Sequence, residues 1–160
     1  MAAIKFNNIG IIGRPRTTPE SVDTLLLLVN LLKKHSYKLV LESETAHTLP
    51  QIDVPVLPKE KIASENDLII VVGGDGSLLN AAHAVVESET PMLGINRGRL
   101  GFLTDIHPNE IQTKLLGVLE GGYHVEQRFL LEAGVYHNKT QLHQEIALNE
   151  VVLMPGEYAH

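Results

Sequence analysis

An unbroken apolar run that leads directly into three glycines and one aspartate is the strongest constraint on how this chain folds. Residues 67–72 read Asp-Leu-Ile-Ile-Val-Val, and residues 73–76 follow as Gly-Gly-Asp-Gly. A run rich in β-branched residues, without polar alternation, is typical of a strand buried on both faces of a parallel sheet. Residues 78–86 favour a helix. The sequence therefore predicts a strand, a tight turn and a helix.

The same alternation of strand and helix extends over the first three quarters of the chain. Short apolar runs predict strands at residues 8–13, 39–41 and 91–96, helical spacing predicts helices at 17–35 and 108–119, and three prolines make residues 48–59 irregular. This order indicates an α/β fold, with an open, mostly parallel sheet flanked by helices. We place this domain at residues 1–122.

After residue 122 the pattern changes. Apolar and polar residues alternate better at 125–135 and 142–154, and residues 137–140 suit a hairpin turn. We expect residues 123–160 to be the start of a second, all-β domain. Two strands rarely form a stable domain alone, so we expect this domain to be truncated.

The glycine turn has the composition of a phosphate site with a working carboxylate. Glycine permits close approach of the backbone to a phosphate and also permits positive φ, and the N-terminus of the following helix attracts anions. Asp75 repels phosphate unless it holds a divalent metal or orients an attacking hydroxyl. These tasks belong to phosphoryl transfer.

Two better-known glycine loops do not fit. A P-loop requires Gly-Lys-Ser/Thr after its glycines, and no lysine follows here. The dinucleotide fingerprint requires a third glycine where Leu79 stands. A plain strand–helix turn with Asp75 as a helix cap is the remaining structural alternative.

Charge and composition exclude several classes of binding partner. There are 13 basic and 19 acidic side chains, a net charge of −6, and no cysteine. This balance argues against general nucleic-acid binding, and the lack of cysteine excludes disulfides and thiolate metal sites. No stretch has the length of a membrane span. We expect a cytoplasmic protein that binds small nucleotides, with no nucleic-acid or membrane partner.

Three motifs, in order, resemble the NAD kinase family. The Gly-Gly-Asp-Gly-Ser motif at 73–77 is shared with phosphofructokinases and diacylglycerol-type lipid kinases. The second motif, residues 93–105 (LGINRGRLGFLTD), looks like an NAD kinase motif over its whole length, and residues 147–153 (ALNEVVL) resemble the family's Asn-Asp/Glu strand. The resemblance covers essentially the whole chain.

The resemblance implies that the protein phosphorylates the 2′-hydroxyl of the adenosine ribose of NAD to give NADP. ATP, or polyphosphate in some relatives, is the donor, with Mg²⁺ or another divalent cation. By the same resemblance, Asp75 orients and deprotonates the hydroxyl, Gly76 cradles phosphate, and Asn149 and Glu150 bind the nucleoside of NAD. Phe102 is expected near the adenine.

Further residues are candidates for binding the ligand. Arg97 and Arg99 suit phosphate, with a solvated loop as the alternative. His160 stands where relatives often have Arg, so we include it among the ligand-binding residues. We assign no metal ligand in the chain. Adjacent Asn149 and Glu150 point to opposite faces of a regular strand, so both reach one ligand only if the strand bends, ends or bulges there.

NAD kinases continue well past the last residue of this sequence, so we expect these 160 residues alone to have little or no kinase activity. Strand edges of an incomplete β domain tend to pair with another chain, and we expect a homo-oligomer. Another kinase with the Gly-Gly-Asp-Gly motif, or a non-catalytic NAD(P)-sensing module, remains the alternative.

Overall fold

The computed structural model describes residues 6–14, 18–97, 103–104 and 106–154. The chain divides into two compact units, Met1–Val125 and Glu126–His160. No helix in the described ranges is both long enough and apolar enough to cross a membrane.

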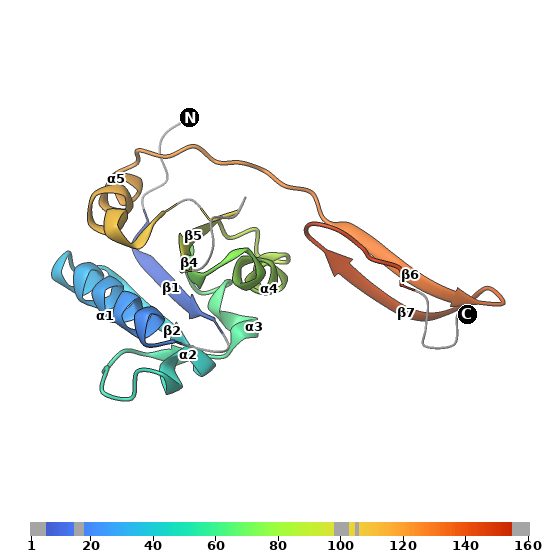
Figure 1. Ribbon diagram of the computed structural model, residues 1–160, viewed down its shortest axis with the longest axis horizontal. Helices are drawn as coiled ribbons and strands as arrows, with labels where there is room; N and C mark the ends of the chain where they lie inside the picture. The colour runs from blue at the N-terminus through green and yellow to red at the C-terminus, as the bar shows by residue number, and fades with distance from the viewer. Residues whose placement is uncertain (1–5, 15–17, 98–102, 105, 155–160) are drawn as a thin grey trace. The chain divides into compact units, whose positions relative to one another are not determined.

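A five-stranded parallel sheet forms the centre of the first unit (Figure 1). Its order is β3-β2-β1-β4-β5, and every neighbouring pair is parallel. The strands are β1 (Asn8–Gly13), β2 (Lys38–Glu42), β3 (Val56–Leu57), β4 (Leu68–Gly73) and β5 (Met92–Asn96). The predicted α/β class with a parallel sheet is confirmed.

One strand was missed in the segment predicted to be irregular. The two-residue β3 lies among the prolines of residues 48–59 and pairs only with β2. Prolines are tolerated there because an edge strand has only one neighbour to bond, and the Pro55 carbonyl accepts a hydrogen bond from the Leu41 amide at 2.9 Å.

The first unit's helical segments are α1 (Pro19–Lys34), α2 (Ser43–His47), α3 (Lys59–Ile62), α4 (Asp75–Val85), η1 (Pro108–Glu110), η2 (Ile111–Leu115) and α5 (Leu116–Leu119). The helix predicted from residue 78 begins at Asp75, because the Gly74 carbonyl already accepts hydrogen bonds from the Ser77 and Leu78 amides. The helix predicted at 108–119 consists of successive 3₁₀, π and α segments.

Both faces of the sheet are covered, which explains the unbroken apolar run. Leu68, Ile70 and Val72 pack into the cluster that includes α1 and residues 111–119. Ile69 and Val71 pack on the opposite face with α3 and α4. All six residues of β4 are buried. The strand is therefore fixed by packing from both sides, as Figure 1 shows for the helices around it.

The second unit contains a hairpin of β6 (Leu131–His137) and β7 (Thr140–Ala147). Asn138 and Lys139 form its turn with φ of 47° and 68°, which suits a two-residue turn of type I′. The strands predicted at 125–135 and 142–154 are too long. A strand is defined by a bonded partner, and the antiparallel pairing spans only Leu131–His137 and Thr140–Ala147.

Candidate functional site

The strand order reverses between β1 and β4, which lie side by side in the sheet (Figure 1). β2 and β3 extend the sheet to one side of this pair, and β5 extends it to the other. In open α/β sheets, ligands bind outside the carboxyl ends of the strands at such a reversal. The carboxyl ends here are Gly13 of β1 and Gly73 of β4. The glycine turn therefore lies at the expected ligand edge.

Within the turn, the glycines have different reasons to be glycine. A Cβ on Gly73 would lie 2.2 Å from the Ser77 Oγ and 2.5 Å from its Cβ, so a side chain is sterically excluded. A Cβ on Gly74 or Gly76 would meet no atom within 4 Å. None of the three has a positive φ, so the positive φ that glycine permits is not used. Gly73 is required by its closeness to Ser77, and close approach to a phosphate stays a prediction. Open space beside Gly74 and Gly76 leaves their backbone accessible.

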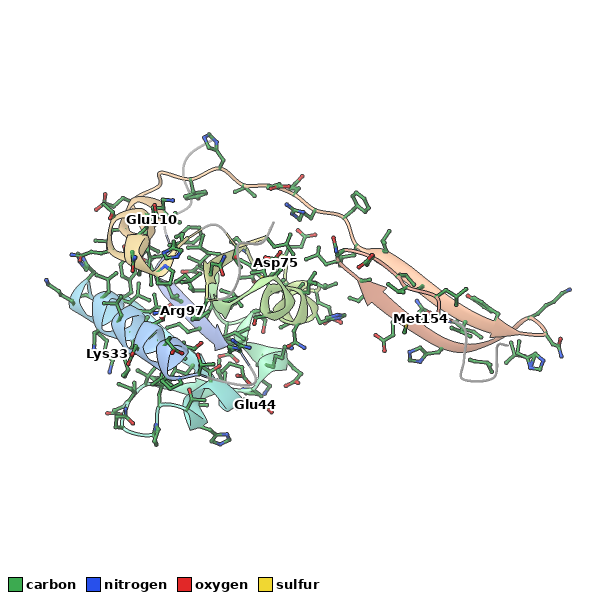
Figure 2. All side chains as sticks on the ribbon, viewed as in Figure 1. Lys33, Glu44, Asp75, Arg97, Glu110 and Met154 are labelled. Carbon is green, nitrogen blue, oxygen red and sulfur yellow. The ribbon has the colours of Figure 1, made fainter. Side chains whose placement is uncertain are left out.

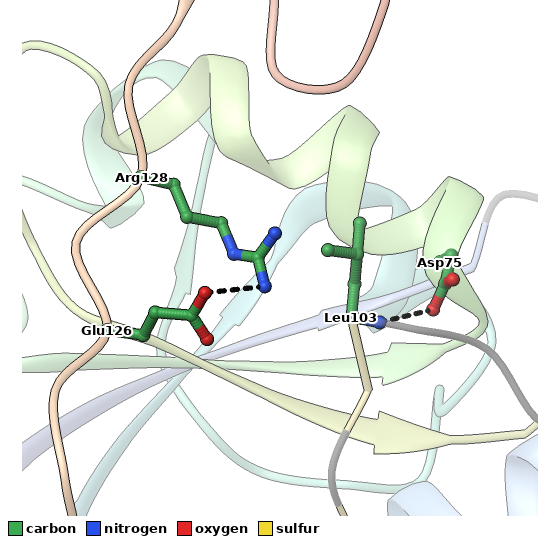
Figure 3. Close-up of polar contacts among 4 residues, drawn as sticks. All are labelled: Asp75, Leu103, Glu126 and Arg128. Atoms are coloured by element: carbon green, nitrogen blue, oxygen red, sulfur yellow. Dashed lines mark hydrogen bonds and ion pairs between the residues drawn. The ribbon is translucent and has the colours of Figure 1, made fainter.

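Asp75 is the first residue of α4, and Gly74 takes the N-cap position. The Oδ1 of Asp75 accepts a hydrogen bond from the backbone amide of Leu103 at 3.1 Å (Figure 3). This bond joins the glycine turn to the segment after β5, so the first and second motifs meet at this carboxylate. Both Asp75 and Leu103 are half-buried.

Arg97 ties the end of β5 to its neighbours. Its amide donates to the Gly73 carbonyl at 2.8 Å, and its Nε donates to the Thr24 Oγ1 on α1. The Thr24 hydroxyl donates in turn to the Glu20 carbonyl at 2.8 Å. Arg97, labelled in Figure 2, thus links β5, β4 and α1. Its predicted pairing with phosphate stays a prediction.

A pocket of about 260 Å³ lies beside Arg97, where β5 ends and α1 and η1 begin; it is lined by Thr18, Glu20, Asn96, Arg97, His107 and Pro108. A hydrogen bond from its own amide and another from the Thr18 hydroxyl hold the pKa of Glu20 below its usual value, with a smaller contribution from Arg97. A larger hollow of about 580 Å³ lies where β1 and β2 begin. It contains none of the predicted site residues, so we place the site at the carboxyl edge.

Asn149 and Glu150 lie within the strand predicted at residues 142–154 but beyond the end of the observed strand β7. β7 ends at Ala147, residues 148–149 form a bend, and both side chains are exposed. The strand end and bend meet the condition for adjacent residues to reach one ligand. Asp75 and Gly76 belong to the first unit, and Asn149 and Glu150 to the second. Arg99, Phe102 and His160 fall outside the described residues.

No group of three or more His, Cys, Asp or Glu residues with metal-binding geometry occurs among the described residues. Mg²⁺ usually retains several waters and binds one or two carboxylates plus substrate phosphates. A single carboxylate, Asp75, beside the open glycine turn is compatible with an ion of this kind.

Sequence reasoning missed two contacts that shape this edge. The Leu103 amide was missed because a backbone donor has no signal in the sequence. The second is a buried chain of hydrogen bonds from Glu42 through Thr45 to Gly13. Glu42 follows the Leu39–Leu41 run directly, but glutamate is not among the residues that usually cap helices, so the sequence carried no signal for this contact.

Comparison with known proteins gives consistent matches. Residues 9–123 match the ATP-NAD kinase N-terminal domain. An NAD kinase of Teredinibacter turnerae is 46% identical over 152 residues, 95% of this chain and 52% of the relative. One from Acinetobacter baylyi is 45% identical over 159 residues, 99% of this chain and 52% of the relative. The chain spans about half the length of these curated relatives.

Two solved structures share the fold. Yeast NADH kinase, crystallised with NADH, matches 90% of this chain and 46% of its own with a TM-score of 0.75 at 18% identity. An NAD kinase from Archaeoglobus fulgidus in complex with ATP matches 84% of this chain and 45% of its own with a TM-score of 0.53 at 21% identity.

Proposed function

Because the chain belongs to the ATP-NAD kinase family, we propose that the complete protein phosphorylates the 2′-hydroxyl of the adenosine ribose of NAD to give NADP. ATP is the donor, with polyphosphate as the alternative. The acceptor oxygen forms a bond to the terminal phosphorus, the bond from that phosphorus to the bridging oxygen breaks, and ADP leaves. The hydroxyl proton goes to a base. The proposal concerns the complete protein, because this chain spans about half the length of the relative from Teredinibacter turnerae.

The observation that carries the proposal is the position of the Asp75 carboxylate. It stands at the start of α4, flanked by Gly74 and Gly76, and is oriented by the Leu103 amide. The open space at both glycines admits a phosphate, and the helix N-terminus favours its charge. A carboxylate held next to that space is placed to accept the proton of an attacking hydroxyl.

The other site residues have binding tasks in this proposal. Gly76 offers its backbone to phosphate, and Asn149 and Glu150 hydrogen-bond the nucleoside of NAD. His160 contributes a further ligand contact. Mg²⁺ or another divalent cation, held mainly by the donor's phosphates, neutralises part of the charge that builds up during transfer. We also propose a cytoplasmic enzyme that acts as a homo-oligomer.

The test is a substrate screen with the complete polypeptide, ATP and Mg²⁺. NAD, fructose 6-phosphate and diacylglycerol are offered separately, and phosphorylated product is measured for each. We expect only NAD to be consumed. Consumption of either other acceptor would assign the protein to another kinase class, and tight NADPH binding without any turnover would make it a sensing module.

The same assay applied to the 160-residue chain tests whether this half suffices. We expect little or no NADP, because the rest of the protein supplies much of the NAD pocket. NADP formation at the rate of the complete protein would show that Asp75 and the residues described here are enough.

A further inference from the structure

A buried carboxylate lies two strands away from Asp75 on the same edge of the sheet. Glu42 is the last residue of β2 and is only 6% exposed. Its Oε1 accepts a hydrogen bond from the Glu44 amide at 3.0 Å, and its Oε2 accepts one from the Thr45 amide at 2.9 Å. The two bonds cap α2, the helix that carries Glu44 in Figure 2.

Capping does not account for the third bond. The Thr45 hydroxyl donates to the Glu42 Oε2 at 2.9 Å, and its oxygen accepts a hydrogen bond from the Gly13 amide at 2.7 Å. Thr45 is 3% exposed. Because its single proton is directed to the carboxylate, its lone pairs face the Gly13 amide. We call this chain, from Gly13 through Thr45 to Glu42, the β1 relay.

The β1 relay replaces the strand pairing that stops short of the site. β1 pairs with β2 only as far as Ile11 and Leu41, whereas on its other side it continues to pair with β4 up to Gly13 and Val72. The relay therefore takes the place of β2 as the partner of the last residue of β1. A Cβ on Gly13 would lie 3.2 Å from the Thr45 Cγ2, so the approach is close.

The end of β1 is next to the glycine turn. A Cβ built on Gly73 would lie 3.6 Å from the Arg14 Cβ, so the residue after Gly13 lies beside the turn. β1 and β4 are also the two strands between which the order reverses. A ligand at that position lies beside the carboxyl ends of both strands, so the end of β1 at Gly13 borders the site.

We propose that Glu42 is a positioning residue that acts through Thr45 to fix the Gly13 amide, and with it the wall of the phosphate site at the end of β1. This proposal deepens the proposed kinase function and rests on it for its kinetic consequences. Asp75 is held from the β5 side by Leu103, so loss of the relay weakens the binding of phosphate-bearing substrates and leaves the proton-accepting group in place.

The test compares Thr45→Val, which keeps the shape of the side chain but removes the hydroxyl, with Thr45→Ser, which keeps the hydroxyl. In the complete protein we expect Thr45→Val to raise the Kd for ATP and the KM for ATP about tenfold, with kcat changed less than about threefold, because a buried amide loses its acceptor. Thr45→Ser restores both values. Glu42→Ala, which removes the acceptor of the Thr45 hydroxyl, gives the effect of Thr45→Val and serves in its place if that variant does not fold.

Thr48→Val is the matched control. Its hydroxyl donates to the Thr45 carbonyl at 2.7 Å, at the end of the same helix, and not to the carboxylate of Glu42. We expect it to lower Tm without changing the Kd for ATP. If Thr45→Val and Glu42→Ala also lower Tm and leave ATP binding at the wild-type value, the relay is only structural and the proposal is wrong. Calorimetric ATP binding needs no turnover, so this result is separate from any failure to make NADP.

Discussion

Each of the two units of the chain is stabilised by a different kind of interaction. Every buried apolar side chain in the described residues lies at or before Leu119, in the sheet unit. In residues 126–154 none is buried, and the hairpin is held by its backbone ladder. The Arg128–Glu126 ion pair at 2.8 Å (Figure 3) precedes β6 and is exposed. An isolated hairpin is marginally stable. The carboxylate proposed as base is thus on a rigid element, whereas Asn149 and Glu150 are on a segment without a core.

The largest expected difference concerns side-chain packing. Ile70 of β4 is 0% exposed, and Val135 of β6 is 55% exposed. We expect Ile70→Ala to lower the free energy of unfolding by about 2–5 kcal/mol, because it leaves a cavity in the core. The matched Val135→Ala should cost less than about 0.5 kcal/mol. Native-state hydrogen exchange of the 160-residue chain, read separately in the two units, measures both losses; equal losses would contradict the comparison.

A smaller effect separates two glycines within the sheet unit. Gly73→Ala forces a methyl group against Ser77, and we expect it to destabilise the fold by about 1–3 kcal/mol. Gly76→Ala meets no atom within 4 Å, so stability should be unchanged or higher by up to about 1 kcal/mol.

The same pair separates packing from function. In Gly76→Ala the added methyl group occupies the space proposed for phosphate. We therefore expect the rate of NADP formation by the complete protein to fall while its Tm does not. NADP formation at the wild-type rate by Gly76→Ala would contradict the proposal that phosphate binds in that space.

The smallest effect is electrostatic. Hydrogen bonds from the Asn8 and Asn7 amides, both at 2.9 Å, hold the pKa of Asp67 below its usual value. A lowered folded-state pKa stabilises the fold above the unfolded value of about 4, and this contribution is lost as the pH falls through the folded pKa. Asp67→Asn should therefore lower Tm at pH 7 and match the wild type at the acid end. A Tm difference that persists unchanged in acid would contradict this assignment.

The sequence predicted what depends on local, continuous patterns. β4, the glycine turn and α4 follow one another along the chain, and each has its own signal in residues 67–86. β3 was missed because two residues among prolines have no period. The hairpin strands were predicted too long because alternation does not reveal where the bonded partner ends.

The features of the site that the sequence did not predict depend on contacts between distant segments. The Asp75–Leu103 bond joins residues 28 apart and uses a backbone donor. The Gly13–Thr45 bond joins residues 32 apart across a strand end. Composition and spacing do not specify either bond, because both require the sheet to be folded first.

The central claim, that Asp75 is the base at the ligand edge of the sheet, is tested most directly by Asp75→Asn in the complete protein. The asparagine Oδ1 can still accept the Leu103 amide, so the fold and Tm should be retained. With ATP, NAD and Mg²⁺, we expect the rate of NADP formation to fall by about 10²–10⁴-fold, the range typical of a lost general base. NADP formation at the wild-type rate in a folded Asp75→Asn protein would contradict the claim.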